Sequence, residues 1–377
     1  MNLVYKFPLN ASKAQITAFR KQLDIHGKLY NRALLQKVEQ YEKTKKSDSA
    51  FTQIKSLVPE FRGQGCNISS LQQTIRRLHK AYNTIYNRRG GKPRISTNFT
   101  TIEYSTRGDG WQIIKDEKVS RLRLQFIEGL IEIKNHREFP SEPKNLIVKL
   151  KDGELWGCFV CEQIPEKREK GKTIALDFGL KTFITSSSGD TYEHPLPYKQ
   201  KLGKFQKLQK KIRAIEDEKL KKKKYKILRK VHEKVKNQRA DFLHKLSRKL
   251  VNENSVIIVE DLNFKKLSRE SPGSFISRKY GDVACGEFYR MLSYKAESAG
   301  RQFVKVNPAY TSQNCCVCGV GNESDYKKKD RAYKCKCGNS LDRDINAAKN
   351  ILKLGLESLD LGKNSFSTLG LQSLVRA

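Results

Sequence analysis

The sequence contains no run of 18 apolar residues, the length at which an apolar segment becomes a candidate for crossing a bilayer. The stretch MNLVYKFPLNASKAQ also lacks the apolar core of a signal peptide. A protein of the membrane surface would need an apolar anchor or a helix with a strong apolar face. We therefore expect a soluble, cytoplasmic protein with no membrane partner.

Acidic residues are few relative to basic ones. The 377 residues include 40 Asp and Glu against 75 Lys and Arg, which gives a formal net charge of +35. Such an excess of one sign repels itself in a compact protein unless a polyanion neutralises it. Nucleic acid suits this role, because phosphates contacted by Lys or Arg release condensed counterions. The length favours two or three domains.

Cysteine is concentrated in one place rather than spread as a disulfide framework. Five of the nine cysteines lie between Cys315 and Cys337, which in a long intracellular chain favours a metal site. Cys158 and Cys161 also form a CxxC, but in the segment ELWGCFVCEQI, which is typical of a strand. Residues three apart on a strand face opposite sides, so we expect these two cysteines to be core side chains.

The concentrated cysteines have the spacing of a zinc site. Cys315-x-x-Cys318 is followed, after sixteen residues, by Cys335-x-Cys337. Four thiolates in two close pairs suit one tetrahedral Zn²⁺, and because they leave no position for water the ion would be structural. The second pair is CxC rather than the more usual CxxC, and Cys316 is an alternative ligand in the first pair.

The pattern of the N-terminal half predicts an antiparallel sheet with a helical insertion. Residues 2–9 are typical of a strand, and short alternating runs bounded by Gly and Asp recur over 95–165. We expect residues 1–10 and 95–165 to form one small β-barrel or sandwich, and residues 11–94 to be a mostly helical insertion.

Two capping-box patterns mark helix starts in this insertion. They are Ser12 with Gln15, and Ser69 with Gln72. In the first helix Phe19, Leu23, Tyr30, Leu34 and Val38 are predicted to form the apolar face.

The C-terminal half predicts an α/β domain over residues 171–310 and 339–355, interrupted by a cysteine-containing insertion over 311–338. Residues 199–250 are basic and helical, with apolar stripes that fit two long helices packed as a hairpin. The KKKK block at 221–224 is interpreted as the tip of its loop. Residues 356–377 are expected to be a weakly patterned tail.

Three carboxylates occupy positions where an isolated charge would be costly. Asp177 ends the apolar run TIALD, Glu260 ends VIIVE, and either Asp342 or Asp344 begins the last helix. A carboxylate at the end of a buried strand is expensive unless it is paired or binds a cation. If the two strands are neighbours, Asp177 and Glu260 lie close together. Asp261 could serve instead of Glu260, but should point to the opposite side if the strand continues.

Clustered carboxylates of this kind predict Mg²⁺ binding. Mg²⁺ takes carboxylate oxygens and retains waters that can meet phosphate. Two such ions about 3.5–4 Å apart can hold the attacking and leaving oxygens of a phosphoryl displacement. We therefore expect two catalytic Mg²⁺ ions and phosphodiester hydrolysis.

Five segments closely resemble, in order and spacing, the transposon-encoded TnpB family, which is related to the compact type V CRISPR effectors. The resemblance covers residues 171–355, and more loosely the N-terminal half through YKFPLNASKAQ and LYNRAL. The five segments are IALDFGLKTFITSSSG, DFLHKLSRKLV, VIIVEDLN, NPAYTSQNCCVCG and CGNSLDRDINAAKNI.

The resemblance implies a RuvC-type nuclease domain with an RNase H-like fold that carries Asp177, Glu260 and Asp344. Asp344 matches the acid of the family's D-x-N-A-A motif and is preferred over Asp342 for that reason. The zinc module is then an insertion in the nuclease domain. Residues 1–10 with 95–165 correspond to the family's wedge β-barrel, and residues 11–94 to its helical recognition segment.

The resemblance also implies an RNA-guided DNA endonuclease. An RNA derived from the transposon end would guide cleavage of double-stranded DNA beside a short motif. We expect a monomer in the prokaryotic cytoplasm, associated with the nucleoid.

Two other functions compete with this one: a nuclease-inactive RNA-guided repressor, and an accessory or strand-transferring transposition protein. A repressor is expected to have lost acids that this chain retains. A Tyr-dependent transposase needs a His-x-His pair, and none occurs among the six histidines.

Overall fold

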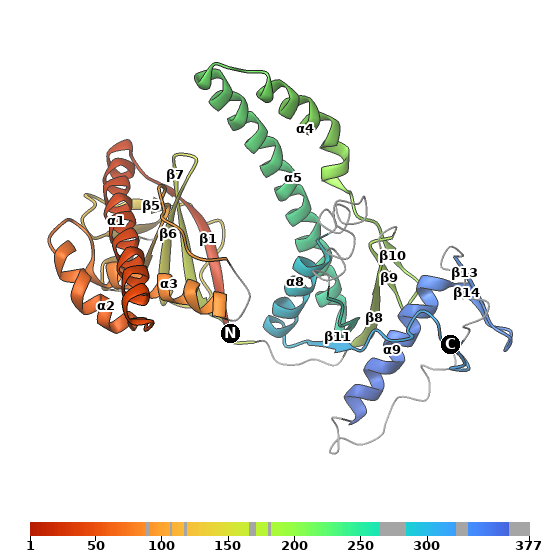
Figure 1. Ribbon diagram of the computed structural model, residues 1–377. Helices are drawn as coiled ribbons and strands as arrows, with labels where there is room; N and C mark the ends of the chain where they lie inside the picture. The colour runs from red at the N-terminus through yellow and green to blue at the C-terminus, as the bar shows by residue number, and fades with distance from the viewer. Residues whose placement is uncertain are drawn as a thin grey trace. The chain divides into compact units, whose positions relative to one another are not determined.

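The computed structural model divides into two compact units, Met1–Ile164 and Pro165–Ala377, each described here by itself (Figure 1). The residues that the structure describes are 1–86, 91–105, 108–116, 119–165, 171–179, 182–263, 284–321 and 331–361.

The first unit is built on a seven-stranded antiparallel sheet. Its order is β2-β6-β7-β1-β5-β4-β3, so β1 (Asn2–Asn10) lies at the centre. It joins strands that begin some 90 residues later in the chain, as the sequence predicted. The other strands are β2 (Thr101–Tyr104), β3 (Trp111–Lys115), β4 (Ser120–Leu124), β5 (Ile131–Ile133), β6 (Asn145–Lys151) and β7 (Glu154–Glu162).

This sheet is strongly curled. Trp111 on edge strand β3 and Phe159 on β7 have ring centroids 6.3 Å apart, although three strands separate them in the sheet. Four strand spacings in a flat sheet would place them about 19 Å apart. The inner faces therefore close around one apolar core, which corresponds to a half-barrel with β2 and β3 as its edges. Cys161 is buried in this core, whereas Cys158 faces the other side and is half-buried.

The helical insertion contains α1 (Lys13–Thr44), α2 (Ala50–Leu57), a short 3₁₀ helix (Val58–Phe61) and α3 (Ile68–Tyr86). The predicted capping box of α1 is present: Ser12 Oγ accepts from the Gln15 amide, and Gln15 Oε1 accepts from the Ser12 amide. Phe19, Leu23 and Leu34 are buried as predicted. Val38 is not, with 40% of its surface exposed.

The predicted cap of α3 was wrong. Ser69 lies inside the first turn, and Asn67 caps the helix instead, with Oδ1 accepting from the Ser70 amide at 2.8 Å. Asn and Ser are both good N-caps. Ser69 and Gln72 have the spacing of a capping box, but they lie two residues C-terminal to the position of the true cap.

The second unit contains a five-stranded mixed sheet in the order β10-β9-β8-β11-β12. Strands β8 (Lys172–Phe178), β11 (Asn254–Glu260) and β12 (Gln302–Val306) are parallel, while β9 (Ile184–Ser186) and β10 (Thr191–Tyr192) continue the sheet antiparallel. The prediction that VIIVE belongs to a buried strand is confirmed: Ile257, Ile258 and Val259 have no exposed surface.

Helices cover both faces of this sheet. Alternate residues such as Leu176 and Ile257 pack with α5 (Glu218–Glu253) and α8 (Cys285–Ser298). The residues between them, Ala175 and Ile258, pack with α9 (Arg343–Leu361) on the other face. This is a three-layer α/β arrangement. By the same alternation, Asp177 and Glu260 belong to the α9 face.

The basic segment forms the predicted helical hairpin, which extends away from the sheet (Figure 1). α4 (Pro197–Arg213) packs on the N-terminal half of α5 through Phe205, Ile212, Leu228 and Val235. The assignment of KKKK to the loop was wrong. Lys221–Lys224 lie in the first turns of α5, which begins at Glu218 after the cap Asp217.

Helix α9 packs very closely on the sheet. A Cβ placed on Gly355 would lie 2.4 Å from the Ile258 side chain, so only glycine permits this approach. The helix continues to Leu361, beyond the predicted limit at residue 355, and residues 362–377 of the predicted tail lie outside the described residues. Among the described helices, none combines the length and the apolar character that crossing a bilayer requires.

Candidate functional site

The strands β8 and β11 carry two of the predicted acids to one place. The two strands pair in parallel, with Leu176 opposite Val259, so Asp177 and Glu260 are the next pair in this register. Both side chains belong to the face covered by α9, whose first turn contains Asp344. Strand pairing and helix packing together bring acids from three distant parts of the chain to the carboxyl edge of the parallel strands.

Asp177 lies electrostatically at the centre of this group. Burial, followed by the charges of Glu260 and Asp344, raises the pKa of Asp177 to about 8. Arg343 and the hydrogen bond from the Phe178 amide act in the opposite direction but are weaker. The carboxyl group is therefore placed where its negative charge lacks compensation.

Glu260 is buried, with 8% of its surface exposed. Burial raises the pKa of Glu260, and the hydroxyl of Thr311, which donates to Oε1, partly opposes this rise. The phenol of Tyr289 on α8 donates to the Glu260 carbonyl at 2.9 Å. The strand end and its side chain are thus held from both faces of the sheet.

The two candidate acids at the start of α9 have different environments. Asp342 is the helix cap, since its Oδ1 accepts from the amides of Asp344 at 2.8 Å and Ile345 at 3.4 Å. The Asp344 carboxylate instead pairs with Arg331 and Arg343, both at 3.3 Å, and acts on the pKa of Asp177.

Asp261 lies on the other side of the sheet, as expected. Its carboxylate pairs at 2.9 Å with Lys305 of β12, whose neighbour Val306 packs on the α9 face. Alternation along β12 places Lys305 and its partner on the opposite face. Asp261 is 62% exposed at its side chain and is separate from the three clustered acids.

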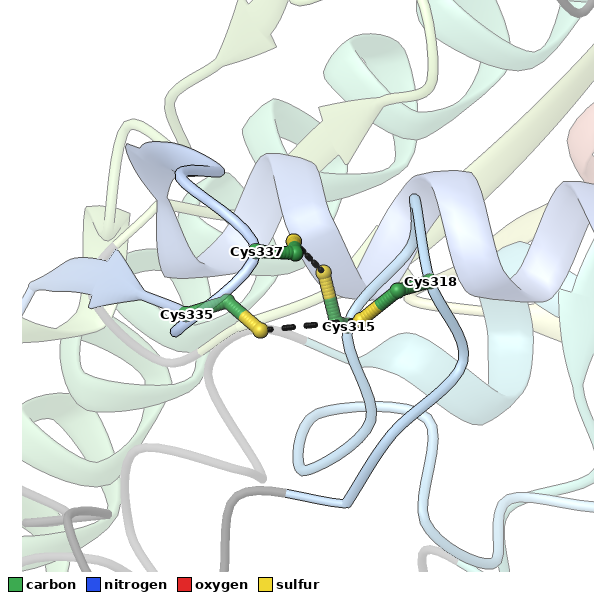
Figure 2. A group of neighbouring side chains, drawn as sticks. All are labelled: Cys315, Cys318, Cys335 and Cys337. Atoms are coloured by element: carbon green, nitrogen blue, oxygen red, sulfur yellow. Dashed lines mark hydrogen bonds between the residues drawn. The ribbon is translucent and has the colours of Figure 1, made fainter.

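The four cysteines predicted to bind zinc meet in space (Figure 2). Their sulfur atoms all lie within 4.8 Å of one another, and the Sγ–Sγ distances are 3.6 Å for Cys315–Cys337 and for Cys318–Cys335. A tetrahedral ion with Zn–S bonds of about 2.3 Å needs sulfurs about 3.8 Å apart. Cys316 is outside this group.

Polar neighbours favour the thiolate at Cys315. Burial alone would raise the pKa of this thiol, but the amides of Cys318 and Val317 and the side chain of Asn339 outweigh it and lower the pKa to about 6. Asn339 Nδ2 donates to Cys315 Sγ at 3.3 Å. The arrangement of donors and sulfurs fits a bound Zn²⁺, which takes cysteine as thiolate.

The carboxylates are less tightly gathered than the cysteines. In the described part of the chain, only the cysteines bring three or more possible ligand atoms within 4.8 Å of one another. Asp177 interacts with both other acids, and all three supply the hard oxygen donors that Mg²⁺ prefers.

Two asparagines join the cysteine module to the carboxylates, and sequence reasoning did not identify them. Asn346 Oδ1 accepts from the Cys316 amide at 3.0 Å, and Asn350 Nδ2 donates to the carbonyls of Thr311 and Asn314 at 2.8 and 2.7 Å. Thr311 in turn bonds Glu260. The sequence signal that could have identified them is their spacing of four residues, which places both asparagines on one face of the helix.

Two family models match the chain. The model described as "Cas12f1-like, TNB domain" covers residues 286–351, which include the cysteine module and the start of α9. The model described as "Probable transposase" covers residues 158–271, which include β8, the helical hairpin and β11. The two matches together contain Asp177, Glu260 and Asp344.

Two bacterial relatives match most of the chain. A Streptomyces pristinaespiralis protein assigned as an RNA-guided DNA endonuclease is 28% identical over 301 residues, 78% of this chain and 72% of that protein. Escherichia coli K12 InsQ, with the same assignment, is 24% identical over 95% of this chain and 94% of its own length.

A solved structure supports the fold. The Cas12f1 protein in a complex with guide RNA and target DNA matches with a TM-score of 0.61 and 17% identity, over 90% of this chain and 82% of that one. The fold of the chain is therefore that of the compact effectors. The family models and the two long relatives confirm the resemblance of the chain to the TnpB proteins and the compact effectors.

Proposed function

We propose that this chain is an RNA-guided DNA endonuclease of a transposon, which hydrolyses phosphodiester bonds at the site of Asp177, Glu260 and Asp344. The observation that carries the proposal is the convergence of these three acids at the carboxyl edge of the parallel strands, where two of them raise the pKa of the third. Carboxylates placed without compensating charge are typical of metal-dependent active sites.

The residues fit Mg²⁺, and we assign two ions to them. Asp177, Glu260 and Asp344 would hold these ions through their carboxylate oxygens. Bound there, Mg²⁺ supplies positive charge to the phosphate and to the attacking and leaving oxygens. Thr311 holds the Glu260 carboxylate, and Asp342 fixes the first turn of α9 and so the position of Asp344. Arg331 and Arg343, which pair with the Asp344 carboxylate, would supply positive charge for a phosphate bound at this site.

The basic surface fits the proposed RNA and DNA partners. The net charge of +35 favours a polyanionic partner, because contacts between phosphates and Lys or Arg release counterions. On α4, Lys204, Lys207 and Lys211 line one side of a shallow groove of about 410 Å³ and repeat at helical spacing. Such a row of ammonium groups suits the backbone of a nucleic acid, which carries phosphates at regular intervals.

The remaining assignments follow the same family. Residues 171–310 and 339–355 form a RuvC-type domain with an RNase H-like fold, supported by the mixed sheet with helices on both faces. Residues 311–338 form its zinc insertion with one structural Zn²⁺. Residues 1–10 with 95–165 form the wedge-like half-barrel, and 11–94 the recognition segment. The protein acts as a monomer in the cytoplasm.

The test is a cleavage assay on double-stranded DNA with protein purified together with its RNA. The RNA should be a defined species, and DNA complementary to part of it should be cut only when Mg²⁺ is present. Sequencing the RNA supplies the target, since base pairing reads the sequence and the protein reads backbone and a short flanking motif. Cleavage without RNA, or copurification of random fragments only, would contradict guidance.

A matched variant separates chemistry from binding. Asp177→Asn removes a ligand charge, so cleavage should fall by several orders of magnitude. Attraction to nucleic acid should not weaken, because a negative charge has been removed. The alternative of a nuclease-inactive repressor predicts that the parental protein and the variant behave alike, with binding and no cleavage.

A further inference from the structure

Phe126 stands out in the first unit because a bulky side chain occupies a glycine conformation. Its φ is 61°, in the left-handed region, and the Ile127 amide closes a turn on the Leu124 carbonyl at 3.2 Å. Phe126 is the third residue of this four-residue turn. Turns with φ > 0 at the third residue prefer Gly or Asn there, and a phenylalanine in that conformation is strained. The side chain nevertheless gains little burial, since 53% of it is exposed. Strain of this kind at an exposed residue points to a binding role.

The loop that carries Phe126 is held firmly. Gln22 Nε2 on α1 donates to the Gln125 carbonyl at 3.0 Å, and Gln15 Nε2 donates to the Glu128 carbonyl at 2.9 Å. The Gln125 amide donates to the Gly110 carbonyl at 2.8 Å. With these bonds on both sides of the loop, the exposed ring is presented in a fixed position rather than on a free tip.

Phe126 borders two open cavities. One, of about 480 Å³, is lined by the β3–β4 hairpin, including Trp111, Arg123 and Gly129. The other, of about 570 Å³, lies along α1 and is lined by Lys13, Lys21 and Gln64 among others. Phe126 lines both, and each volume is in the range that holds a small ligand.

The ring and the nearby cations are unused within the described residues. Phe126 stacks on no other ring there, and Lys13, Lys21 and Arg123 form no ion pair there. Phe51, the other strongly exposed phenylalanine of this unit, differs because the Lys55 ammonium lies 4.6 Å from its ring centroid. An open aromatic face beside unpaired cations is the arrangement that binds a nucleic-acid base together with its phosphates.

We propose that Phe126 is a stacking platform for an unpaired base of the bound RNA, with Lys13, Lys21 and Arg123 contacting the adjoining phosphates. This inference rests on the proposed function for the presence of the RNA. RNA is favoured over target DNA because proteins read RNA through bases splayed out of loops and bulges and stacked on aromatic rings, whereas bases of duplex DNA are already stacked on one another. A single exposed ring that borders two cavities suits one splayed base and its neighbours.

The proposal is tested by ultraviolet crosslinking of the full-length protein purified with its RNA, followed by digestion and mass spectrometry. A ribonucleotide adduct on Phe126 is the expected result. Adducts on other peptides but none on Phe126 would overturn the proposal, as would an adduct that forms only with added target DNA and contains deoxyribonucleotides.

A substitution separates stacking from folding. Phe126→Gly suits the turn better, so the melting temperature should stay the same or rise, while the dissociation constant for the copurified RNA should increase roughly 5- to 100-fold, as expected for loss of one stacked base. Phe126→Trp should bind nearly as the parent does, and Phe51→Ala is the matched control that leaves affinity unchanged. Equal affinity of Phe126→Gly and the parent would overturn the proposal.

The same experiments distinguish this inference from the nuclease proposal. An adduct on Phe126 in a protein that does not cut DNA contradicts the nuclease proposal alone. Guided cleavage by a protein without that adduct contradicts the stacking platform alone. A protein that carries no RNA contradicts both.

Discussion

The cysteine cluster and the carboxylate cluster lie in the same unit, yet they differ in how closely their possible ligand atoms are gathered. The four sulfurs already have the spacing of a tetrahedral ion. The carboxylates interact across a wider space, and burial together with mutual repulsion raises the pKa of Asp177 to about 8. One cluster is assembled by short turns of the backbone, and the other by the packing of three separate elements.

The difference corresponds to the two proposed roles. A structural ion needs complete, closed coordination, and two tight turns can provide it locally. A catalytic site for a metal cation must keep negative charge uncompensated until the cation binds, because that charge is what attracts it. Thr311, Asn346 and Asn350 join the two clusters, so the closed site supports the open one.

The sharpest test of this comparison uses the two neighbouring acids of α9. Asp344→Asn removes the proposed metal ligand and should reduce the rate of DNA cleavage by about three orders of magnitude or more. When catalytic residues act as a unit, replacing any one of them removes nearly all of the rate enhancement that the unit provides. Single-turnover cleavage of the matched target with Mg²⁺ is the measurement.

Asp342→Asn is its control. Asn caps helices as well as Asp does, so the turn should persist and the rate should change by less than about threefold. If the order of the two variants is reversed, Asp342 and not Asp344 is the ligand. If both cut at the parental rate, the carboxylate cluster is not the nuclease site.

The cysteine cluster is tested by Cys335→Ser with Cys316→Ser as the neighbouring control. Cys335→Ser should lower zinc content, measured by mass spectrometry of the metal, by about one ion per chain. The melting temperature should fall by roughly 5 °C or more, because zinc binding contributes to folding. Cys316→Ser should leave both values unchanged, and loss of zinc in that variant would move the ligand assignment.

The uncompensated charge of the open site predicts a pH effect on stability without metal. The folded-state pKa of Asp177, about 8, lies above its ordinary value of 3.8, so the folded protein binds the extra proton between these values. Stability is then complete at low pH and falls as pH rises towards 8. In EDTA at pH 8.5, Asp177→Asn should melt roughly 2–4 °C above the parent.

Near pH 4 the same two proteins should differ little in melting temperature, because the parental carboxyl group is then protonated in the folded state and already partly protonated in the unfolded state. Mg²⁺ should raise the melting temperature of the parent at pH 8.5 more than that of the variant. A parent that melts higher than Asp177→Asn at pH 8.5 in EDTA would contradict the sign of this effect.

The smallest expected effect concerns the link between the clusters. Thr311→Val removes the hydroxyl that donates to Glu260, which should raise the pKa of that carboxyl further and slow cleavage about threefold to tenfold. The acid limb of the pH–rate profile should move to higher pH. Thr311→Ser keeps the donor and should retain the parental profile; a shift in both variants would indicate a packing effect instead.

Local signals in the sequence were sufficient for many elements of the fold. The capping box at Ser12, the apolar run of β11 and the stripes of the helical hairpin all predicted what the structure contains. Where two residues could cap the same helix, local pattern did not rank them, so Ser69 with Gln72 was predicted although Asn67 is the cap. The prediction that KKKK lies in a loop was wrong for a similar reason. A solvated helix face and a loop can have the same lysine-rich composition.

The sequence by itself predicted that four cysteines have the spacing of a zinc site and that Asp177 and Glu260 end buried strands, because spacing within a short module and position at a strand end are local properties. Between Asp342 and Asp344 the preference came from the family resemblance. Only the tertiary structure decided which acids meet. Pairing of β8 with β11 and the alternation of side chains put Asp177 and Glu260 on the α9 face, and the lack of a side chain at Gly355 lets that helix approach. The tertiary structure also distinguished Asp342 from Asp344. Asp342 accepts a hydrogen bond from the Asp344 amide and caps α9, whereas the Asp344 carboxylate acts on the pKa of Asp177.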